Sequence, residues 1–195
     1  LSKSKKVLLS ELVTIQAGYP FRGTIHHESS GGVKVIQARD ISDLGELLLD
    51  NLVTTNLTGK RDPDWIMKGD ILFSAKGARN TACFIESDLD RTTCSPSLFL
   101  LRVKPVYQDK VNSQFLAWQL NQQIVQNHFK RCAEGSLQTS IRKPVLSATP
   151  IALPEIEIQN TISKLYAANF KETALMRKLI HNRQQQLNAI AADLI

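Results

Sequence analysis

Long hydrophobic runs are missing from this chain. No stretch of its 195 residues approaches the ~18 consecutive apolar residues that a membrane-spanning helix needs. The N-terminus also lacks the charged segment followed by an apolar segment that marks a secretory signal peptide. We therefore expect a cytoplasmic protein without a membrane partner.

Cysteine is scarce and has no recognisable pattern. Cys83, Cys94 and Cys132 are odd in number and form no Cys-X-X-Cys pair, which disfavours a disulfide framework and favours a reducing cytosol. Neither these cysteines nor His26-His27 have the ligand spacing of a zinc site. The sequence therefore predicts no bound metal.

Motifs of catalysis and nucleotide binding are also lacking. The sequence contains no GxxxxGK[ST] phosphate loop and no glycine-rich cofactor loop. It has no Asn/Asp-Pro-Pro-aromatic tetrapeptide of the kind found in amino-methyltransferases, and no motif that would place a Ser-His-Asp set. We expect a chain that is not itself an enzyme and holds no cofactor of its own.

What the chain does have is a basic excess. It carries 24 Lys and Arg against 18 Asp and Glu, for a net charge of +6. Residues 155–195 hold five basic and four acidic side chains, so most of the excess lies in residues 1–154. Such an excess favours a polyanionic partner, most often nucleic acid, although many soluble proteins are as basic without one.

The junction Ile151-Ala-Leu-Pro154-Glu-Ile-Glu-Ile-Gln159 divides the chain into two unlike parts. An apolar strand ends at Pro154, and Glu155 and Glu157 then open a helix whose dipole favours acidic residues in its first turn. The sequence predicts an α+β fold, with a mixed globular head over 1–154 and a long helix over 155–195. If about 38 residues are helical, the helix is roughly 57 Å long.

A broad apolar stripe follows this C-terminal helix, and from Met176 onward it keeps a 4-3 spacing with one polar break at Arg183. So long a helix cannot bury its stripe on a head of about 150 residues, so we expect a coiled-coil pairing, most simply in a homodimer. The open alternative is a helix that folds back along the head. The residues expected to meet a partner helix are Ile162, Leu165, Met176, Leu179, Ile180, Leu187, Ile190 and Leu194.

Within the head, strand and helix patterns are mixed. Strands are predicted at 33–38, 47–53, 71–74, 81–85, 98–103 and 151–153. One helix is predicted over 112–131, capped by Asn112 or Ser113, and a short helix or turn over 10–15. The segments 17–23, 76–80 and 136–144 are expected to be loops, and Trp65 and Trp118 are expected in the core.

Several short motifs follow one another in a defined order. They are Leu9-Ser-Glu-Leu-Val13 with Gly18-Tyr-Pro-Phe21, Gln37-Ala-Arg-Asp-Ile41, Lys68-Gly-Asp-Ile-Leu-Phe-Ser74, Phe115-Leu-Ala-Trp-Gln-Leu-Asn121 with Gly135-Ser136, and Ile151-Ala-Leu-Pro154 with Gln159. In this order, and over nearly the whole chain, they resemble the DNA specificity subunits of type I restriction–modification systems. The Lys-Gly-Asp-Ile-Leu-Phe and Ile-X-Leu-Pro…Gln motifs are the most specific.

This resemblance implies a target recognition domain over 1–154 and a spacer and dimerisation helix over 155–195. It implies a non-catalytic subunit that binds double-stranded DNA by sequence and docks modification (methyltransferase) and restriction subunits. These partners would methylate adenine, with S-adenosylmethionine held in the modification subunit, and cleave DNA. Such subunits usually carry two recognition domains and this chain shows one, which implies a half-subunit that dimerises, a truncated piece of a longer subunit, or a recognition module that works with another protein.

Two alternatives remain open at this stage. The chain begins with Leu1 rather than Met, which leaves room for the C-terminal recognition domain of a fused methyltransferase. A protein-interaction adaptor, whose head binds a protein and whose helix dimerises, would also explain the two-part organisation.

Residues able to read DNA occur on the expected loops and strand ends. Arg, Asn and Gln pair with base edges, while cations and hydroxyls hold phosphates. The candidates are Arg22, Lys34, Gln37, Arg39, Lys76, Arg79, Asn80, Gln138, Thr139, Ser140, Arg142 and Lys143. The 76–80 loop is the first choice, because a glycine turn with two cations and an amide has little use in a core. Structural roles compete elsewhere: Arg39 can pair with Asp40, and Tyr19 and Phe21 can plug the core.

Overall fold

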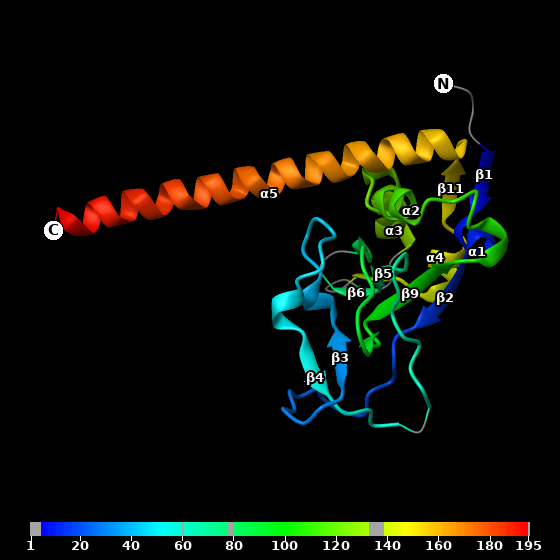
Figure 1. The fold of residues 1–195 in the computed structure, drawn as a ribbon. Coiled ribbons are helices and arrows are strands. Elements are labelled where there is room, and N and C mark those ends of the chain that lie inside the picture. Colours follow the sequence, from blue (N-terminus) through cyan, green and yellow to red (C-terminus); the bar gives the residue numbers. More distant parts are fainter. Residues whose placement is uncertain (1–4, 60, 78–79, 133–138, 195) are drawn as a thin grey trace.

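The computed structural model describes residues 5–59, 61–77, 80–132 and 139–194. These residues form a mixed α+β head and one long helix, α5 (Ile156–Asp193), that extends far beyond the head (Figure 1). The predicted fold class is confirmed. Within the described residues, no helix combines the length and apolar character that crossing a membrane requires.

The described part of the head contains two main sheets and two two-stranded ones. The larger is antiparallel in the order β2 (Val13–Ala17), β9 (Leu98–Val103), β5 (Ile71–Ser74) and β7 (Ala82–Phe84). The smaller has the order β4 (Val53–Thr55), β3 (Val33–Ile36) and β8 (Thr92–Cys94), with β3 and β8 parallel. The central strand β5 is buried along its whole length, which explains why its apolar residues run consecutively rather than alternating.

The two ends of the head meet where the long helix starts. Strand β1 (Lys5–Leu8) pairs antiparallel with β11 (Pro150–Leu153), so that Val7 lies opposite Ile151. The short helix α1 (Leu9–Leu12) then leads into β2. Sequence patterns did not predict β1, because a four-residue, half-polar strand has no period that distinguishes it from a loop.

The predicted helix over 112–131 is in fact two helices, α2 (Ser113–Leu120) and α3 (Gln123–Cys132). The expected Asn112 cap is confirmed, since Asn112 Oδ1 accepts a 2.9 Å hydrogen bond from the Phe115 N–H. The chain turns at Asn121, whose carboxamide accepts from the Ala82 N–H and donates to the Ala82 carbonyl, both at 2.8 Å. The amide thus pairs with the edge of β7 as another strand would.

A second carboxamide does the same for another strand. Gln119 Oε1 accepts from the Ala152 N–H and Gln119 Nε2 donates to the Ala152 carbonyl, both at 2.8 Å. Because buried backbone groups need partners, the side chains of Gln119 and Asn121 complete the edges of β11 and β7 and attach α2 to both strands.

The Lys-Gly-Asp motif before β5 is structural. Gly69 has a φ of 91°, which favours glycine, and Asp70 Oδ2 accepts from the Met67 N–H at 2.8 Å. Arg102 clamps the same carboxylate with two 2.7 Å hydrogen bonds, and the hydrogen bond to Asp70 raises the pKa of Arg102. The motif therefore fixes the start of the central strand.

Two sequence expectations about the head need correction, and the core role weighed for Tyr19 is confirmed. The predicted strand over 47–53 is wrong, because Leu49–Asn51 form a 3-10 turn and extended pairing begins only at Val53 in β4. Trp65 and Trp118 are half-buried rather than fully in the core. Tyr19 is a buried plug, and its hydroxyl accepts a 2.7 Å hydrogen bond from the Gly59 N–H.

The base of α5 is seated on the head through polar side chains. Gln159 is fully buried; its Oε1 accepts from the Asn112 N–H at 3.0 Å, and its Nε2 donates to the carbonyls of Lys110 and Pro154. Tyr166 donates its hydroxyl to the Leu44 carbonyl at 3.2 Å. Beyond Thr173 every described residue of α5 is exposed, so the helix does not fold back along the head.

Candidate nucleic-acid interface

The predicted DNA-contact residues of 76–80 and of 138–143 belong to segments that pair with each other. Strand β6 (Lys76–Gly77) lies antiparallel to β10 (Thr139–Ser140), with Lys76 opposite Ser140. The Ile141 N–H also donates to the Ala75 carbonyl at 2.9 Å. The result is a two-stranded ribbon in place of the separate loops that the sequence suggested.

Residues 94–98 make backbone hydrogen bonds to residues next to three groups of predicted DNA-contact residues. The Tyr19 N–H donates to the Cys94 carbonyl at 2.8 Å, and the Ser95 N–H donates to the Ile36 carbonyl, one residue before Gln37, at 2.8 Å. The Ala75 N–H, one residue before Lys76, donates to the Ser97 carbonyl at 2.9 Å. The 17–23 loop, the end of β3 and the β6–β10 ribbon therefore leave the head from one neighbourhood.

Gly18 permits this close convergence. A Cβ atom built on Gly18 would lie 2.0 Å from the Ser95 carbonyl oxygen and 2.7 Å from the Cys94 carbonyl oxygen. Because both contacts are to backbone atoms, a side chain at this position would push the 17–23 loop away from 94–98.

Net positive charge is concentrated in the segments around the ribbon. Residues 71–85 and 123–153 together carry six Lys and Arg against the single acid Glu134, which accounts for five of the chain's six net charges. Helix α3 belongs to this region, because Phe129 packs edge-on against Phe73 at 5.2 Å and Gln126 Nε2 donates to the Asn80 carbonyl at 2.9 Å.

The sequence reasoning missed two of these cations. Lys130 and Arg131 are exposed on the last turn of α3, a few residues before β10. The sequence patterns assigned them only to a helix. A charge count over 123–153, in place of a count over the whole head, would have singled them out.

The structure places the predicted site residues in different settings. Those with exposed side chains are Arg22, Lys34, Arg39, Lys76, Arg142 and Lys143, and those half-buried are Gln37 and Ser140. Arg79 and Gln138 lie outside the described residues, as does the side chain of Thr139. Helix α4 (Lys143–Ser147) starts directly after Arg142. Arg142 and Lys143 therefore lie where the chain leaves β10.

Asn80 has a structural role. Its side chain is 5% exposed, and its Nδ2 donates a 2.9 Å hydrogen bond to the Ser74 carbonyl. The amide that was expected to meet a base instead holds the turn between β5 and β7. The expectation that this loop has little use in a core is therefore wrong for Asn80.

Arg39 is presented by a short, well-anchored turn. Asp40 is buried and accepts the Gln37 N–H at 2.8 Å. The pKa of Asp40 is raised, because the effect of burial outweighs the opposing effects of this hydrogen bond and of the Arg39 charge. Arg39 Nε lies 3.9 Å from Asp40 Oδ1, yet 65% of the Arg39 side chain is exposed. Such an exposed ion pair is weak and leaves the guanidinium accessible.

Lys34 and Arg22 lie outside the ribbon. Lys34 sits in the middle of β3, between Thr54 and Thr92 of the neighbouring strands. The Arg22 N–H donates to Thr58 Oγ1 at 3.0 Å, which ties the 17–23 loop to the segment after β4. Among the described residues, no group of three or more His, Cys, Asp or Glu side chains gathers as a metal site.

Comparison with known proteins identifies relatives of this arrangement. A family model described as "Type I restriction modification DNA specificity domain" matches residues 2–183. No curated protein sequence matches the chain.

Solved structures share the fold. The HsdS subunit from Thermoanaerobacter tengcongensis is 17% identical with a TM-score of 0.58, and the match covers 91% of this chain and 40% of that one. A chain from a study of complex assembly and conformational transition of the type I R-M system is 16% identical with a TM-score of 0.64, covering 97% and 44%. The type I restriction–modification S subunit from M. genitalium is 15% identical with a TM-score of 0.54, covering 86% and 39%.

This chain therefore spans about two fifths of the length of these solved subunits. Its resemblance in sequence motifs, from Leu9-Ser-Glu-Leu to Gln159, agrees with the extent of the family match. Since that match covers most of the residues, the chain belongs to the family of type I restriction modification DNA specificity domains.

Proposed function

We propose that this chain recognises a double-stranded DNA sequence and serves as a specificity half-subunit of a type I restriction–modification system. One observation carries the proposal: nearly all of the net positive charge lies in the segments that form the β6–β10 ribbon, the end of α3 and the start of α4. A basic surface of this kind binds the phosphate backbone and releases counterions.

The ribbon is suited to base reading because the major groove admits a two-stranded β-ribbon. In this arrangement Lys76, Lys130, Arg131 and Lys143 hold phosphates on either side. Arg39 reaches the same DNA from the turn after β3, and the end of β3 is anchored beside the ribbon through 94–98. Phosphate contacts would then set the position, and the ribbon and Arg39 would supply the sequence preference.

Catalysis belongs to partner subunits in this proposal. A modification subunit would methylate adenine with its own S-adenosylmethionine, and a restriction subunit would direct cleavage. The long exposed arm supports pairing with a second copy. Two copies would supply two recognition domains.

The test is fluorescence anisotropy on a mixed-sequence duplex, titrated with salt. Lys76→Ala and Arg131→Ala should each weaken binding similarly for all sequences and reduce the magnitude of the salt slope by about one. Arg39→Ala should cost about 1–3 kcal/mol at one base position if it reads a guanine.

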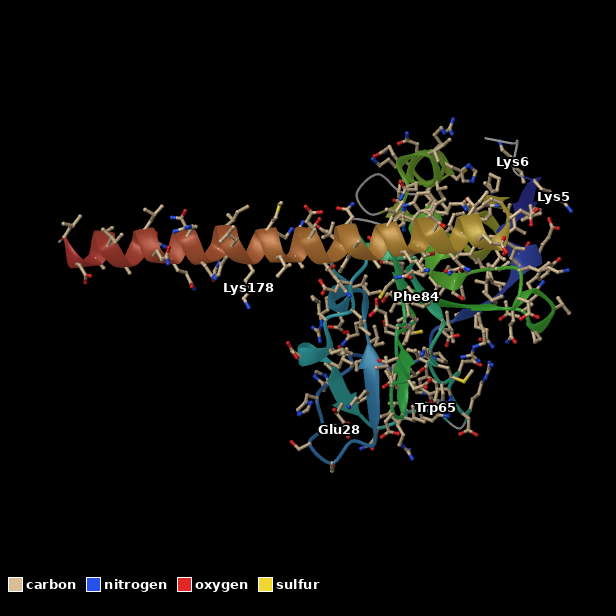
Figure 2. All side chains as sticks on the ribbon, turned by 45° about the horizontal axis from the view of Figure 1, so that its top comes forward. Lys5, Lys6, Glu28, Trp65, Phe84 and Lys178 are labelled. Atoms are coloured by element: carbon tan, nitrogen blue, oxygen red, sulfur yellow. The ribbon has the colours of Figure 1, made fainter. Side chains whose placement is uncertain are left out.

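Lys178→Ala is the matched control, because it removes one cation from the part of α5 that lies beyond the head (Figure 2). It should leave affinity and salt slope unchanged. An adaptor that binds protein through its head would show no steep salt-dependent DNA binding in wild type. That result would overturn the proposal.

A further inference from the structure

A groove runs between the base of α5 and the head. One lobe, of about 450 Å³, is lined by Ile156 of the helix, and the other, of about 360 Å³, by Phe170. Phe84 of β7 and Gln114 of α2 line both lobes, so the lobes are continuous, and Figure 2 shows Phe84 near the base of α5. From Ile156 to Phe170 the helix rises by roughly 21 Å, which matches an extended segment of about six residues.

The lobe beside Phe170 has apolar walls that are open to solvent. Leu47, Phe84, Leu89 and Phe170 line it and are only half-buried. Leu49, which also lines it, is 53% exposed. A cavity of this volume with apolar walls suits a large apolar side chain from an occupant.

The head side of this lobe is acidic, although the chain as a whole is basic. Segments 40–50 and 80–90 supply most of its head residues and contain seven Asp and Glu but no Lys or Arg. Glu46 and Glu86 are exposed and line the lobe, and α5 adds one cation, Lys171. Charge complementarity therefore favours an occupant that is basic around its apolar side chain.

The outer edge of β7 is open beside the groove at Phe84. Ala82 directs its N–H and carbonyl outward to the Asn121 side chain. Because these directions alternate along an antiparallel strand, Phe84 directs its own N–H and carbonyl to the same edge. Within the described residues no side chain or loop accepts the Phe84 N–H, and the Phe84 carbonyl accepts only a 3.8 Å contact from the Cys83 thiol. An extended segment can add to such an edge through backbone hydrogen bonds.

Gln114 can extend this pairing. Gln119 and Asn121 of the motif around α2 each bond the N–H and the carbonyl of one strand residue. Gln114 lines both lobes, and its carboxamide makes no hydrogen bond to the part of the chain that the structure describes. It is therefore available to pair in the same way with the backbone of an incoming segment.

We propose that the groove between α5 and the head binds an extended basic segment of another protein, which adds to the edge of β7 at Phe84 and places an apolar side chain in the lobe beside Phe170. Glu46 and Glu86 meet the cations of that segment. Because α5 forms one wall of the groove, the bound segment also braces the arm against the head. The inference goes beyond the proposed function and needs no DNA, so either can fail without the other.

The test measures binding of the full chain, without DNA, to fluorescein-labelled heptapeptides in which Lys or Arg alternates with Leu, Ile, Val or Phe. Fluorescence anisotropy should detect binding of members of this set. Matched peptides with Glu in place of the cations, or Ser in place of the apolar residues, should not bind. If no member of the basic, apolar set binds, the proposal is wrong.

Filling the lobe should block the peptide. Ala167 lines the lobe, so Ala167→Leu should weaken the tightest peptide at least about tenfold by excluding its apolar anchor. Ala168→Leu is the matched control, because Ala168 is exposed outside the groove, and it should leave the affinity unchanged. Circular dichroism and urea unfolding check that both variants fold. Equal peptide affinity of Ala167→Leu and wild type would contradict the proposal.

Removing the carboxylates should weaken the same peptide without changing the shape of the lobe. Glu46→Gln with Glu86→Gln should lower the affinity about fivefold, as expected for two exposed ion pairs. Asp62→Asn with Asp193→Asn makes the same change of net charge at exposed positions outside the groove and should have no effect. Similar affinities of the two double variants would refute the role of the acidic residues.

Hydrogen exchange followed by NMR locates the bound backbone. The peptide should slow exchange of the Phe84 N–H, whereas the Cys83 N–H, which faces β5, should not change. Unchanged exchange at Phe84 would rule out addition to the β7 edge.

Other occupants of the groove would give different results. Full displacement of the peptide by free leucine amide or arginine amide would indicate a site for a small organic cation. A change of oligomeric state in Ala167→Leu without peptide, seen by sedimentation and missing in Ala168→Leu, would indicate a contact between copies of this chain. Either result would overturn the proposal.

Discussion

At the residue scale, two carboxamide side chains make the hydrogen bonds that a neighbouring strand would otherwise make with a sheet edge. Asn121 and Gln119 each accept from one N–H and donate to the carbonyl of the same residue, on β7 and β11. Both amides belong to the motif Phe115-Leu-Ala-Trp-Gln-Leu-Asn121. The motif is therefore explained by sheet edges that need partners, and not by contact with a ligand.

Removing one of these amides should destabilise the head. Asn121→Ala leaves the Ala82 N–H and carbonyl without their partner, and a buried unsatisfied group costs about 1–3 kcal/mol. Urea unfolding followed by circular dichroism measures the loss. Gln123→Ala is the control, because this exposed glutamine bonds only the side chain of Asn127 among its described contacts. A loss below ~0.5 kcal/mol for Asn121→Ala, the range of ordinary surface changes, would contradict the argument.

The three thiols should differ sharply in reactivity. Burial raises the pKa of Cys83 and of Cys94 to about 12, while Cys132 is exposed. A raised pKa keeps a thiol protonated, and the thiolate is the reactive form. At pH 8 a thiol reagent such as Ellman's should therefore label about one group per native chain and all three after unfolding. Cys132→Ser should abolish the native labelling; fast labelling of all three thiols would refute the burial.

At the scale of elements, the seat of α5 shows how hydrogen bonds of side chains attach the arm to the head. Gln159 joins the first turn of the helix to the Asn112 N–H and to the Lys110 carbonyl, next to the start of α2. Ser163 Oγ bonds Asn112 Oδ1 at 3.1 Å one turn later. Hydrogen bonds are directional, so this seat fixes the angle of the arm while its apolar stripe stays available to a partner.

Gln159→Ala should loosen this seat. The change leaves the Asn112 N–H and the Lys110 carbonyl unpaired, so we expect a loss of about 1–3 kcal/mol and faster amide hydrogen exchange in residues 110–113 and 156–166. Lys164→Ala, an exposed change on the same helix segment, is the control and should alter neither quantity. Unchanged exchange at 110–113 in Gln159→Ala would show that the seat does not depend on this side chain.

At the scale of the whole molecule, two surfaces with different chemistry are separated in space. The segments that carry most of the net positive charge, around β6, β10 and α3, belong to the head, whereas the exposed apolar residues of α5 continue beyond it. Figure 1 shows α5 extending away from the head. If the head binds DNA and the arm binds another helix, as proposed, both can therefore act at the same time.

Two charges placed in the stripe should separate the copies without harming the head. Leu187→Asp with Ile190→Asp buries carboxylates in the proposed helix pair, which is costly, so sedimentation should show monomers. The head should unfold at the same urea concentration as that of wild-type monomer. Gln184→Asp with Asn188→Asp adds the same charges on another face of α5 and should leave the oligomeric state unchanged. Identical species before and after the stripe change would refute a role of the stripe in assembly.

Local features of this protein could be predicted from the sequence. The onset of the long helix after Pro154, the Asn112 cap and the buried strand at 71–74 depend on neighbouring residues, periodicity and backbone chemistry within a few positions. The stripe on α5 and its spacing are also sequence facts, because a regular helix converts position directly into direction.

Contacts between distant segments were decided only by the tertiary structure. The break at Asn121 depends on Ala82, 39 positions earlier, and the burial of Asn80 depends on α3 packing beside it. The ribbon between Lys76 and Ser140, and the convergence on 94–98, join segments with no local signal of each other. Sequence patterns report which residues could bury or bind, whereas long-range pairing determines which of them are covered and which remain exposed together.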